Sequence, residues 1–227
     1  MMGEFRGLLP LLLYIKYMKS QHCGIMGDMK AKYLIGIDEA GRGPLAGPVA
    51  VGLVKVAQDF DWAMIPGVND SKKLSEKKRE EIFNSAKELA KQGFLEYSVK
   101  FVSAQSIDSK GIVSAIRRAI AAGIVELELN PEECFIKLDG SLKAPAEFNQ
   151  ETIIKGDSSE KVIGLASIMA KVIRDHYMLE LDTEFPSYGF ARHKGYGTKN
   201  HREAIKKYGF SVAHRQSFCG NIEVVKD

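Results

Sequence analysis

Five short apolar runs constrain the fold of this chain most strongly. They cover residues 33–37, 47–56, 94–102, 134–138 and 152–155, and most are rich in β-favouring residues. Such length and composition indicate strands. Four stretches between or after these runs have the apolar periodicity of helices: residues 75–91, 112–129, 159–181 and 199–208. Because strands and helices do not alternate strictly, we predict an α/β domain with a mixed five-stranded sheet, helices on both faces and a C-terminal helical segment.

The helical stretches carry their own boundary signals. Ser75 and Thr198 suit the N-caps of the first and last stretches, and Gly93 follows the first. The second stretch stops before Pro131, because a proline restricts the residue that precedes it. The stretch 159–181 is the clearest, since its apolar residues recur at helical spacing: Val162, Leu165, Ala166, Met169, Val172 and Ile173.

Composition favours one globular domain. The chain has 227 residues, of which 45% are hydrophobic, so it can bury a real core. A formal net charge of +3 is weak evidence for a nucleic-acid partner. Cys23, Cys134 and Cys219 are odd in number and far apart, which disfavours a disulfide framework or a zinc site. We therefore expect a reducing, cytoplasmic location.

The N-terminal stretch lacks a membrane or export signal. Its apolar part, residues 8–15, is interrupted by Pro10 and ended by Lys16. It falls well short of the ~20 residues that a membrane helix needs, and a signal peptide needs a longer apolar region and a cleavage site. We predict that residues 1–30 are a dispensable extension and that the protein does not associate with membranes.

Four acidic residues follow the predicted strands: Asp38, Glu39, Asp139 and Asp157. Strand ends converge where ligands bind in α/β sheets. Carboxylates gathered there repel one another, and a hard cation such as Mg²⁺ or Mn²⁺ relieves that repulsion. Taken singly, Asp139 also suits a turn and Asp157 a helix cap. The pair Asp38-Glu39 needs a bulge or a strand end to bring both side chains to one site.

The segment from Asp38 to Gly43 reads Asp-Glu-Ala-Gly-Arg-Gly, and it resembles the signature of ribonuclease HII. Further blocks resemble that family in the same order along the chain. They are residues 69–75, 137–140, 155–158, 166–175, 193–198 and 214–218. The resemblance therefore extends from about Tyr33 to Phe218.

This resemblance implies a ribonuclease H-like fold, with a catalytic domain over residues 31–220 and a tail over 221–227. It implies that Asp38, Glu39, Asp139 and Asp157 hold two divalent ions, Mg²⁺ or Mn²⁺. One ion would activate the attacking water and the other would stabilise the leaving 3′ oxygen. The expected products carry 3′-hydroxyl and 5′-phosphate ends. Asp175 stands outside this set, because Lys171 lies one helical turn before it.

Substrate contacts are expected from two loops and the basic C-terminal segment that begins near residue 186. Glycines let the backbone approach a ribose closely, and an arginine can hold a phosphate. The resemblance assigns the ribonucleotide contact to the loop Gly41-Arg42-Gly43 and the check of its 2′-hydroxyl to Tyr196. Basic side chains that could follow the backbone are Lys72, Lys73, Arg192 and Lys194. For any single lysine, a solvated surface position is an equally simple interpretation.

The predicted activity is endonucleolytic cleavage of RNA in RNA–DNA hybrids, and 5′ of ribonucleotides within duplex DNA, by a monomer. Three alternatives remain open from the sequence. Ribonuclease HIII, the sister family, typically has a lysine where this chain has Arg42. Another nuclease or resolvase on the same fold would cut DNA without ribonucleotides. A hybrid-binding module without activity would lack part of the acidic set.

The spacing of three histidines, His193, His201 and His214, is not that of metal ligands. We interpret them as phosphate contacts or structural groups.

Overall fold

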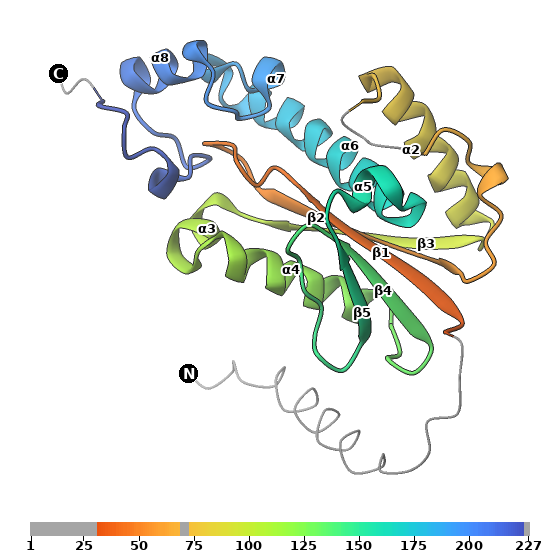
Figure 1. The fold of residues 1–227 in the computed structure, drawn as a ribbon. Helices are drawn as coiled ribbons and strands as arrows, with labels where there is room; N and C mark the ends of the chain where they lie inside the picture. The colour runs from red at the N-terminus through yellow and green to blue at the C-terminus, as the bar shows by residue number, and fades with distance from the viewer. Residues whose placement is uncertain (1–30, 69–72, 225–227) are drawn as a thin grey trace, which may run out of the picture. The chain divides into compact units, whose positions relative to one another are not determined.

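A five-stranded mixed sheet forms the centre of the fold, in the order β3-β2-β1-β4-β5 (Figure 1). The computed structural model describes residues 31–68 and 73–224. The strands are β1 (Tyr33–Ala40), β2 (Val49–Ala57), β3 (Leu95–Val102), β4 (Cys134–Asp139) and β5 (Asn149–Ile153). The first three pair antiparallel, and β1, β4 and β5 pair parallel. The predicted mixed sheet is therefore confirmed.

Helices cover both faces of the sheet, as predicted (Figure 1). One face packs against α3 (Ala104–Lys110) and α4 (Ile112–Glu126). The other packs against α2 (Glu76–Lys91) and the long α6 (Lys161–Glu184), which the one-turn α5 (Gly156–Ser159) precedes. Cys134 is buried in the first of these cores with a free thiol.

Several boundaries differ from the sequence prediction. Strand β1 does not end before Asp38 but continues to Ala40, because its antiparallel pairing with β2 persists that far. Strand β5 lies at residues 149–153 instead of 152–155, in parallel register with β4. Helix α4 ends three residues earlier than expected, and α3, which Ser103 caps, was not predicted. The long helix begins at Lys161 because Glu160 adopts an extended conformation.

The C-terminal segment forms a third apolar cluster beside the end of α6. It contains α7 (Phe190–His193), α8 (Lys199–Tyr208) and the 3-10 helices η2 (Pro186–Tyr188) and η3 (Gln216–Phe218). Thr198 caps α8 through its side chain, as predicted. Ile222, from the segment predicted to be a tail, is buried in this cluster. Residues 1–30 lie outside the described residues, so the predicted dispensable extension stays a prediction. None of the helices described is both long and apolar enough to cross a membrane.

Close packing of α6 on the sheet depends on a glycine in β1. A Cβ atom built on Gly36 would lie 2.1 Å from the carbonyl oxygen of Val162. The carbonyl oxygen belongs to buried backbone of α6, and the Cβ would be attached to buried backbone of β1. Neither atom could move away without a costly shift of its whole element. The absence of a side chain at this position therefore allows the first turn of α6 to lie directly on β1.

We expect Gly36→Ala to lower the free energy of unfolding by at least ~2 kcal/mol, since overpacked cores typically lose 1–3 kcal/mol. Thermal unfolding of the purified variant measures the loss. Gly220→Ala is the matched control, because no atom lies within 4 Å of a Cβ built there. Equal melting temperatures for the two variants would contradict the packing argument.

Candidate active site

Strand β1 places Asp38 on the face of the sheet that α6 covers. Gly36 faces α6, and side chains two residues apart share a face, so Asp38 points the same way. It is 4% exposed and accepts a hydrogen bond from the hydroxyl of Ser167 on α6. Its carboxylate also accepts the backbone N–H of Glu39, with 2.7 Å between nitrogen and oxygen.

Glu39 leaves β1 on the opposite face, so alternation separates the two neighbouring carboxylates at their Cβ atoms. The β1–β2 ladder stays regular through Ala40 and contains no bulge. On the other side, the pairing of β1 with β4 ends at Ile37 opposite Leu138. Glu39 therefore lies beyond the end of the neighbouring strand. Strand β1 therefore has neither the bulge nor the strand end at Asp38-Glu39 that was expected to bring both carboxylates to one site.

Asp139 lies beside Asp38, and Asp157 lies on the turn that Asp139 contacts. Because β1 and β4 run parallel and pair up to Ile37 and Leu138, the next residues of the two strands are Asp38 and Asp139. An oxygen of Asp139 accepts the backbone N–H groups of Gly156 and Asp157, at 2.7 and 3.4 Å. Asp157 is 2% exposed and lies in α5, not at the start of the long helix. Asp157 therefore lies inside a one-turn helix and does not cap α6, whose N-cap is Glu160.

Burial dominates the electrostatics of this group. Together with the negative charges of Glu39 and Asp139, and against the hydrogen bond from Ser167, burial raises the pKa of Asp38 to about 8 from its ordinary 3.8. A carboxylate held in this way favours either a proton or a cation. In the part of the chain described, no three His, Cys, Asp or Glu side chains form a ready metal cluster. The oxygen-only donors and the raised pKa nevertheless suit a hard divalent ion.

The glycine-rich loop after β1 turns sharply at Gly41, whose φ is +82°. A side chain there would also overlap Arg174, whose Nε lies 1.9 Å from the position of a Cβ. Arg42 and Gly43 are exposed, and the Arg42 guanidinium forms an ion pair with Glu39 at 3.1 Å. The loop therefore lies beside Glu39, and its predicted contact with a substrate stays a prediction.

Tyr196 lies on a second loop that packs against the first. The backbone N–H groups of Leu45 and Ala46 donate to the carbonyl oxygen of Gly195, at 2.9 and 3.3 Å. A Cβ on Gly195 would lie 2.2 Å from the carbonyl oxygen of Ala46, so only glycine permits this approach. Tyr196 itself is 47% exposed. The fold thus brings the two predicted ribonucleotide-contacting segments together, although they are far apart in sequence.

A chain of buried hydrogen bonds supports the Tyr196 loop from beneath. The backbone N–H of Ser211 can only donate and the carbonyl of Tyr196 can only accept, which fixes every proton between them. Ser211 N–H donates to His214 Nδ1 at 3.0 Å, and His214 Nε2–H donates to His201 Nε2 at 3.1 Å. His201 Nδ1–H then donates to the carbonyl of Tyr196 at 2.9 Å. These two histidines are structural groups, one of the two roles expected for them.

We expect acid to destabilise the protein through this pair. Burial lowers the pKa values of His201 and His214 to about 4 from the ordinary 6.5. Because the folded pKa values are depressed, both rings contribute stability above pH 6.5 and lose it as the pH falls toward 4. An added proton would also set two N–H groups against each other between the rings.

Melting temperatures of the wild type and His214→Asn between pH 7 and pH 4 test this expectation. The wild type should be the more stable at pH 7, and the difference should narrow as the pH falls toward 4. A difference that stays constant over this range would show that His214 does not titrate as argued.

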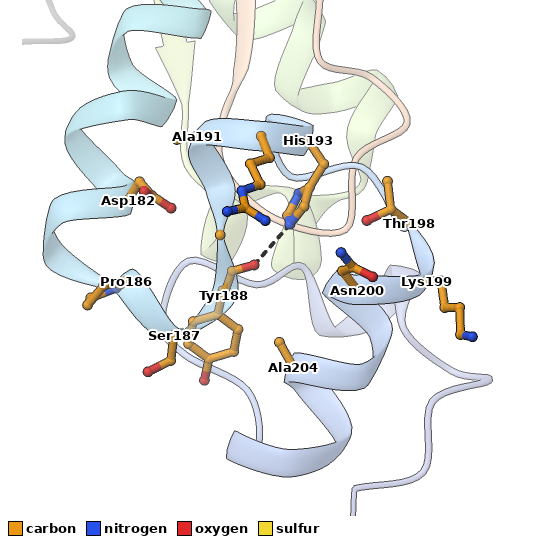
Figure 2. Close-up of a pocket in the computed structure, with 12 residues that line it drawn as sticks. Asp182, Pro186, Ser187, Tyr188, Ala191, His193, Thr198, Lys199, Asn200 and Ala204 are labelled. Atoms are coloured by element: carbon orange, nitrogen blue, oxygen red, sulfur yellow. Dashed lines mark hydrogen bonds between the residues drawn. The ribbon is translucent and has the colours of Figure 1, made fainter.

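The predicted basic contacts are dispersed. Lys72 lies outside the described residues, and Lys73 is exposed at the adjoining turn. The Lys194 ammonium donates to the carbonyl of Ala191, three residues earlier in the chain. Arg192 lines a pocket of about 710 Å³ between the end of α6, α7 and α8. Figure 2 shows that pocket, including the hydrogen bond from His193 Nε2 to the Tyr188 carbonyl, 2.9 Å long. Its lining includes none of the four carboxylates.

Three further residues at the site were not singled out from the sequence. Ser167 contacts Asp38. Arg174 and Arg215 are almost fully buried and bind the backbone of the glycine-rich loop. A signal existed for Arg174, since it stands in the apolar stripe of α6, four residues from Ala170 and from Met178. Asp175, by contrast, pairs with Lys171 at 2.8 Å, as predicted.

Comparisons with known proteins point to one family. The family model described as Ribonuclease HII matches residues 35–221. The Ribonuclease HII of Clostridioides difficile (strain 630) is 46% identical over 190 residues, covering 84% of this chain and 71% of the relative. The solved RNase HII in the PCNA:RNase HII complex from Archaeoglobus fulgidus matches with a TM-score of 0.66 and 25% identity, covering 86% of this chain and 96% of that one.

A more distant likeness extends to the sister family. Bst-RNase HIII, solved in complex with Mn²⁺, matches with a TM-score of 0.57 and 17% identity, over 84% of this chain and 66% of that chain. At 17% identity, this structural match shows a shared fold and nothing more. The predicted ribonuclease H-like fold is thereby confirmed.

Proposed function

The chain belongs to the ribonuclease HII family and is a hydrolase of the ribonuclease H class, and we propose that Asp38, Glu39, Asp139 and Asp157 form its catalytic centre. Hydrolysis of the RNA strand in RNA–DNA hybrids follows from family membership. We further propose that the enzyme cuts on the 5′ side of single ribonucleotides in duplex DNA. The products would carry 3′-hydroxyl and 5′-phosphate ends.

One observation carries this proposal above the others. Asp38 and Asp139 directly follow the last paired residues of two parallel strands, and Asp139 binds the N–H groups of the α5 turn that carries Asp157. Two carboxylates and the turn that carries a third are therefore held together at the ends of β1 and β4. Their repulsion and burial, expressed in the raised pKa of Asp38, describe a site that is short of positive charge.

The carboxylates would hold Mg²⁺ or Mn²⁺, which when bound activates water and stabilises the leaving oxygen of a phosphodiester. Water adds to phosphorus, the bond from phosphorus to the 3′ oxygen breaks, and that oxygen takes up a proton. Glu39 holds Arg42 at 3.1 Å, which keeps a cation beside the acidic group for the adjacent phosphate.

Recognition of RNA would come from the two packed loops. The exposed residues Arg42 and Gly43 can bring their backbone close to the ribose, because Gly43 carries no side chain. The exposed ring of Tyr196 lies on the loop bonded to Leu45 and Ala46, so it can cover the same sugar from a second side. Only RNA offers a 2′-hydroxyl there for both loops to read.

Cleavage of three duplexes with Mg²⁺ or Mn²⁺ tests the proposal: DNA with one ribonucleotide, the same sequence without it, and a long RNA–DNA hybrid. We expect a metal-dependent cut 5′ of the ribonucleotide and no cut in the all-DNA duplex. Cleavage of the hybrid alone would favour the HIII-like alternative. Cleavage of the all-DNA duplex would contradict recognition of a 2′-hydroxyl.

A further inference from the structure

Two buried arginines lie beneath the glycine-rich loop. Arg174 on α6 is 1% exposed and Arg215, just before η3, is 0% exposed. Within residues 31–68 and 73–224, every hydrogen bond from either guanidinium ends on a backbone carbonyl, and neither forms an ion pair with a carboxylate. A buried charge without an ionic partner is costly. This cost indicates that the two arginines serve to hold the loop backbone in one conformation.

Arg215 holds the loop by three carbonyls. Its guanidinium donates to the carbonyl oxygens of Gly41 at 2.7 Å, Arg42 at 2.9 Å and Gly47 at 2.9 Å. No described peptide bond is cis, and in a trans peptide the C=O and the following N–H point in opposite directions. Turning the carbonyls of Gly41 and Arg42 inward therefore turns the N–H groups of Arg42 and Gly43 outward, where both residues are exposed.

Arg174 ties this loop to the segment that carries Tyr196. It donates to Pro48 at 2.9 Å and to Ala46 at 3.4 Å in the first loop. The same guanidinium donates to the carbonyl of Lys194 at 3.0 Å, two residues before Tyr196. One side chain therefore binds both loops. The backbone hydrogen bonds from Leu45 and Ala46 to Gly195 join the same two loops independently.

Both guanidiniums keep their charge at neutral pH. Burial lowers both pKa values, that of Arg215 to about 9, and the charge of Arg174 contributes to the shift at Arg215. Carbonyl dipoles are the groups that satisfy them. A lysine would carry the same charge, but its single ammonium cannot reproduce a planar fork bonded to separate carbonyls.

We propose that Arg174 and Arg215 are positioning residues, which fix the outward N–H groups of Arg42 and Gly43 relative to Tyr196 and thereby set the preference for a single embedded ribonucleotide. This inference rests on the proposed function. A single ribonucleotide offers one 2′-hydroxyl, so a displaced loop loses its only contact. A long hybrid offers a 2′-hydroxyl at every nucleotide of its RNA strand. The enzyme can therefore bind it one nucleotide further along and still contact a 2′-hydroxyl.

Arg215→Lys and Arg174→Lys test the inference through a ratio. We expect kcat/KM on the single-ribonucleotide duplex, divided by kcat/KM on the long hybrid, to fall at least ~10-fold. A purely structural defect lowers the folded fraction equally for both substrates and leaves the ratio unchanged. Arg118→Lys, at an exposed position of α4, is the control and should leave the ratio at the wild-type value. A wild-type ratio in both folded variants would overturn the inference.

Amide hydrogen exchange adds a readout that does not need activity. In both variants the amide protons of Leu45 and Ala46 should exchange at least ~10-fold faster, with the β1 amides unchanged. Unaltered exchange at Leu45 and Ala46 would also overturn the inference. A wild type that cleaves neither substrate would instead refute the proposed function, and the exchange result would still decide whether the arginines hold the loops. If Arg215→Lys does not fold, Arg174→Lys supports both measurements alone.

Discussion

Asp38→Asn is expected to abolish cleavage of both the hybrid and the single-ribonucleotide duplex, with a loss of at least ~10³-fold in kcat, or about 4 kcal/mol in the activation barrier. The substitution keeps the shape and the hydrogen bonds with Ser167 and the Glu39 N–H within reach, but removes the charge. Asn cannot supply the anionic oxygen that a hard divalent ion requires. Initial rates with Mg²⁺ and with Mn²⁺ measure the effect.

The same variant should be at least as stable as the wild type when no metal is present. Asp38 is buried, and its raised pKa shows that the folded protein resists its ionisation. A neutral amide removes that penalty, so the melting temperature in EDTA at pH 8 should not fall. Asp59→Asn, an exposed carboxylate after β2, is the control for both measurements. An inactive Asp38→Asn that is also largely unfolded would leave no evidence for a role in chemistry.

Local patterns were sufficient to predict the layers of this fold. Caps such as Ser75 and Thr198 act within one helical turn, so their neighbours in sequence contain the whole signal. The apolar stripe of α6 likewise follows from periodicity. The ends of the strands were harder to predict, because pairing with a neighbouring strand determines where a strand ends. Strand β1 continues through Asp38 since β2 supplies partners up to Ala50, and nothing within residues 33–40 reveals that.

The acidic residues were predictable as candidates, but their arrangement was not. Only the parallel register of β1 and β4 makes Asp38 and Asp139 neighbours. Asp157 lies in the separate one-turn helix α5, which was not predicted. The arginines illustrate the same limit. The apolar stripe of α6 indicated that Arg174 is buried, but not what it contacts. The carbonyls of Pro48 and Gly41, which Arg174 and Arg215 bind, lie 126 and 174 residues away along the chain, and such contacts have no local sequence signature.

Tyr196→Ala should lower kcat/KM on the single-ribonucleotide duplex ~100-fold, or about 2.7 kcal/mol in transition-state stabilisation. The ring is half exposed and no described hydrogen bond depends on its hydroxyl, so it contributes little to the core. The loop should keep its shape, because its contacts to His193 and His201 use the backbone N–H and carbonyl of Tyr196. The long hybrid should be affected less, since it offers further 2′-hydroxyls to Arg42 and Gly43.

Tyr208→Ala is the matched control for this substitution. Tyr208 also belongs to the C-terminal segment and is similarly exposed, at 51% against 47% for Tyr196. Its ring meets the ring of Tyr188, a buried member of the C-terminal cluster, edge-on with 6.3 Å between the ring centroids. Loss of this tyrosine should therefore lower the melting temperature more than activity, whereas loss of Tyr196 should do the reverse. If Tyr196→Ala unfolds the protein but the folded fraction cleaves at the wild-type rate, the ring packs the loop and does not recognise the sugar.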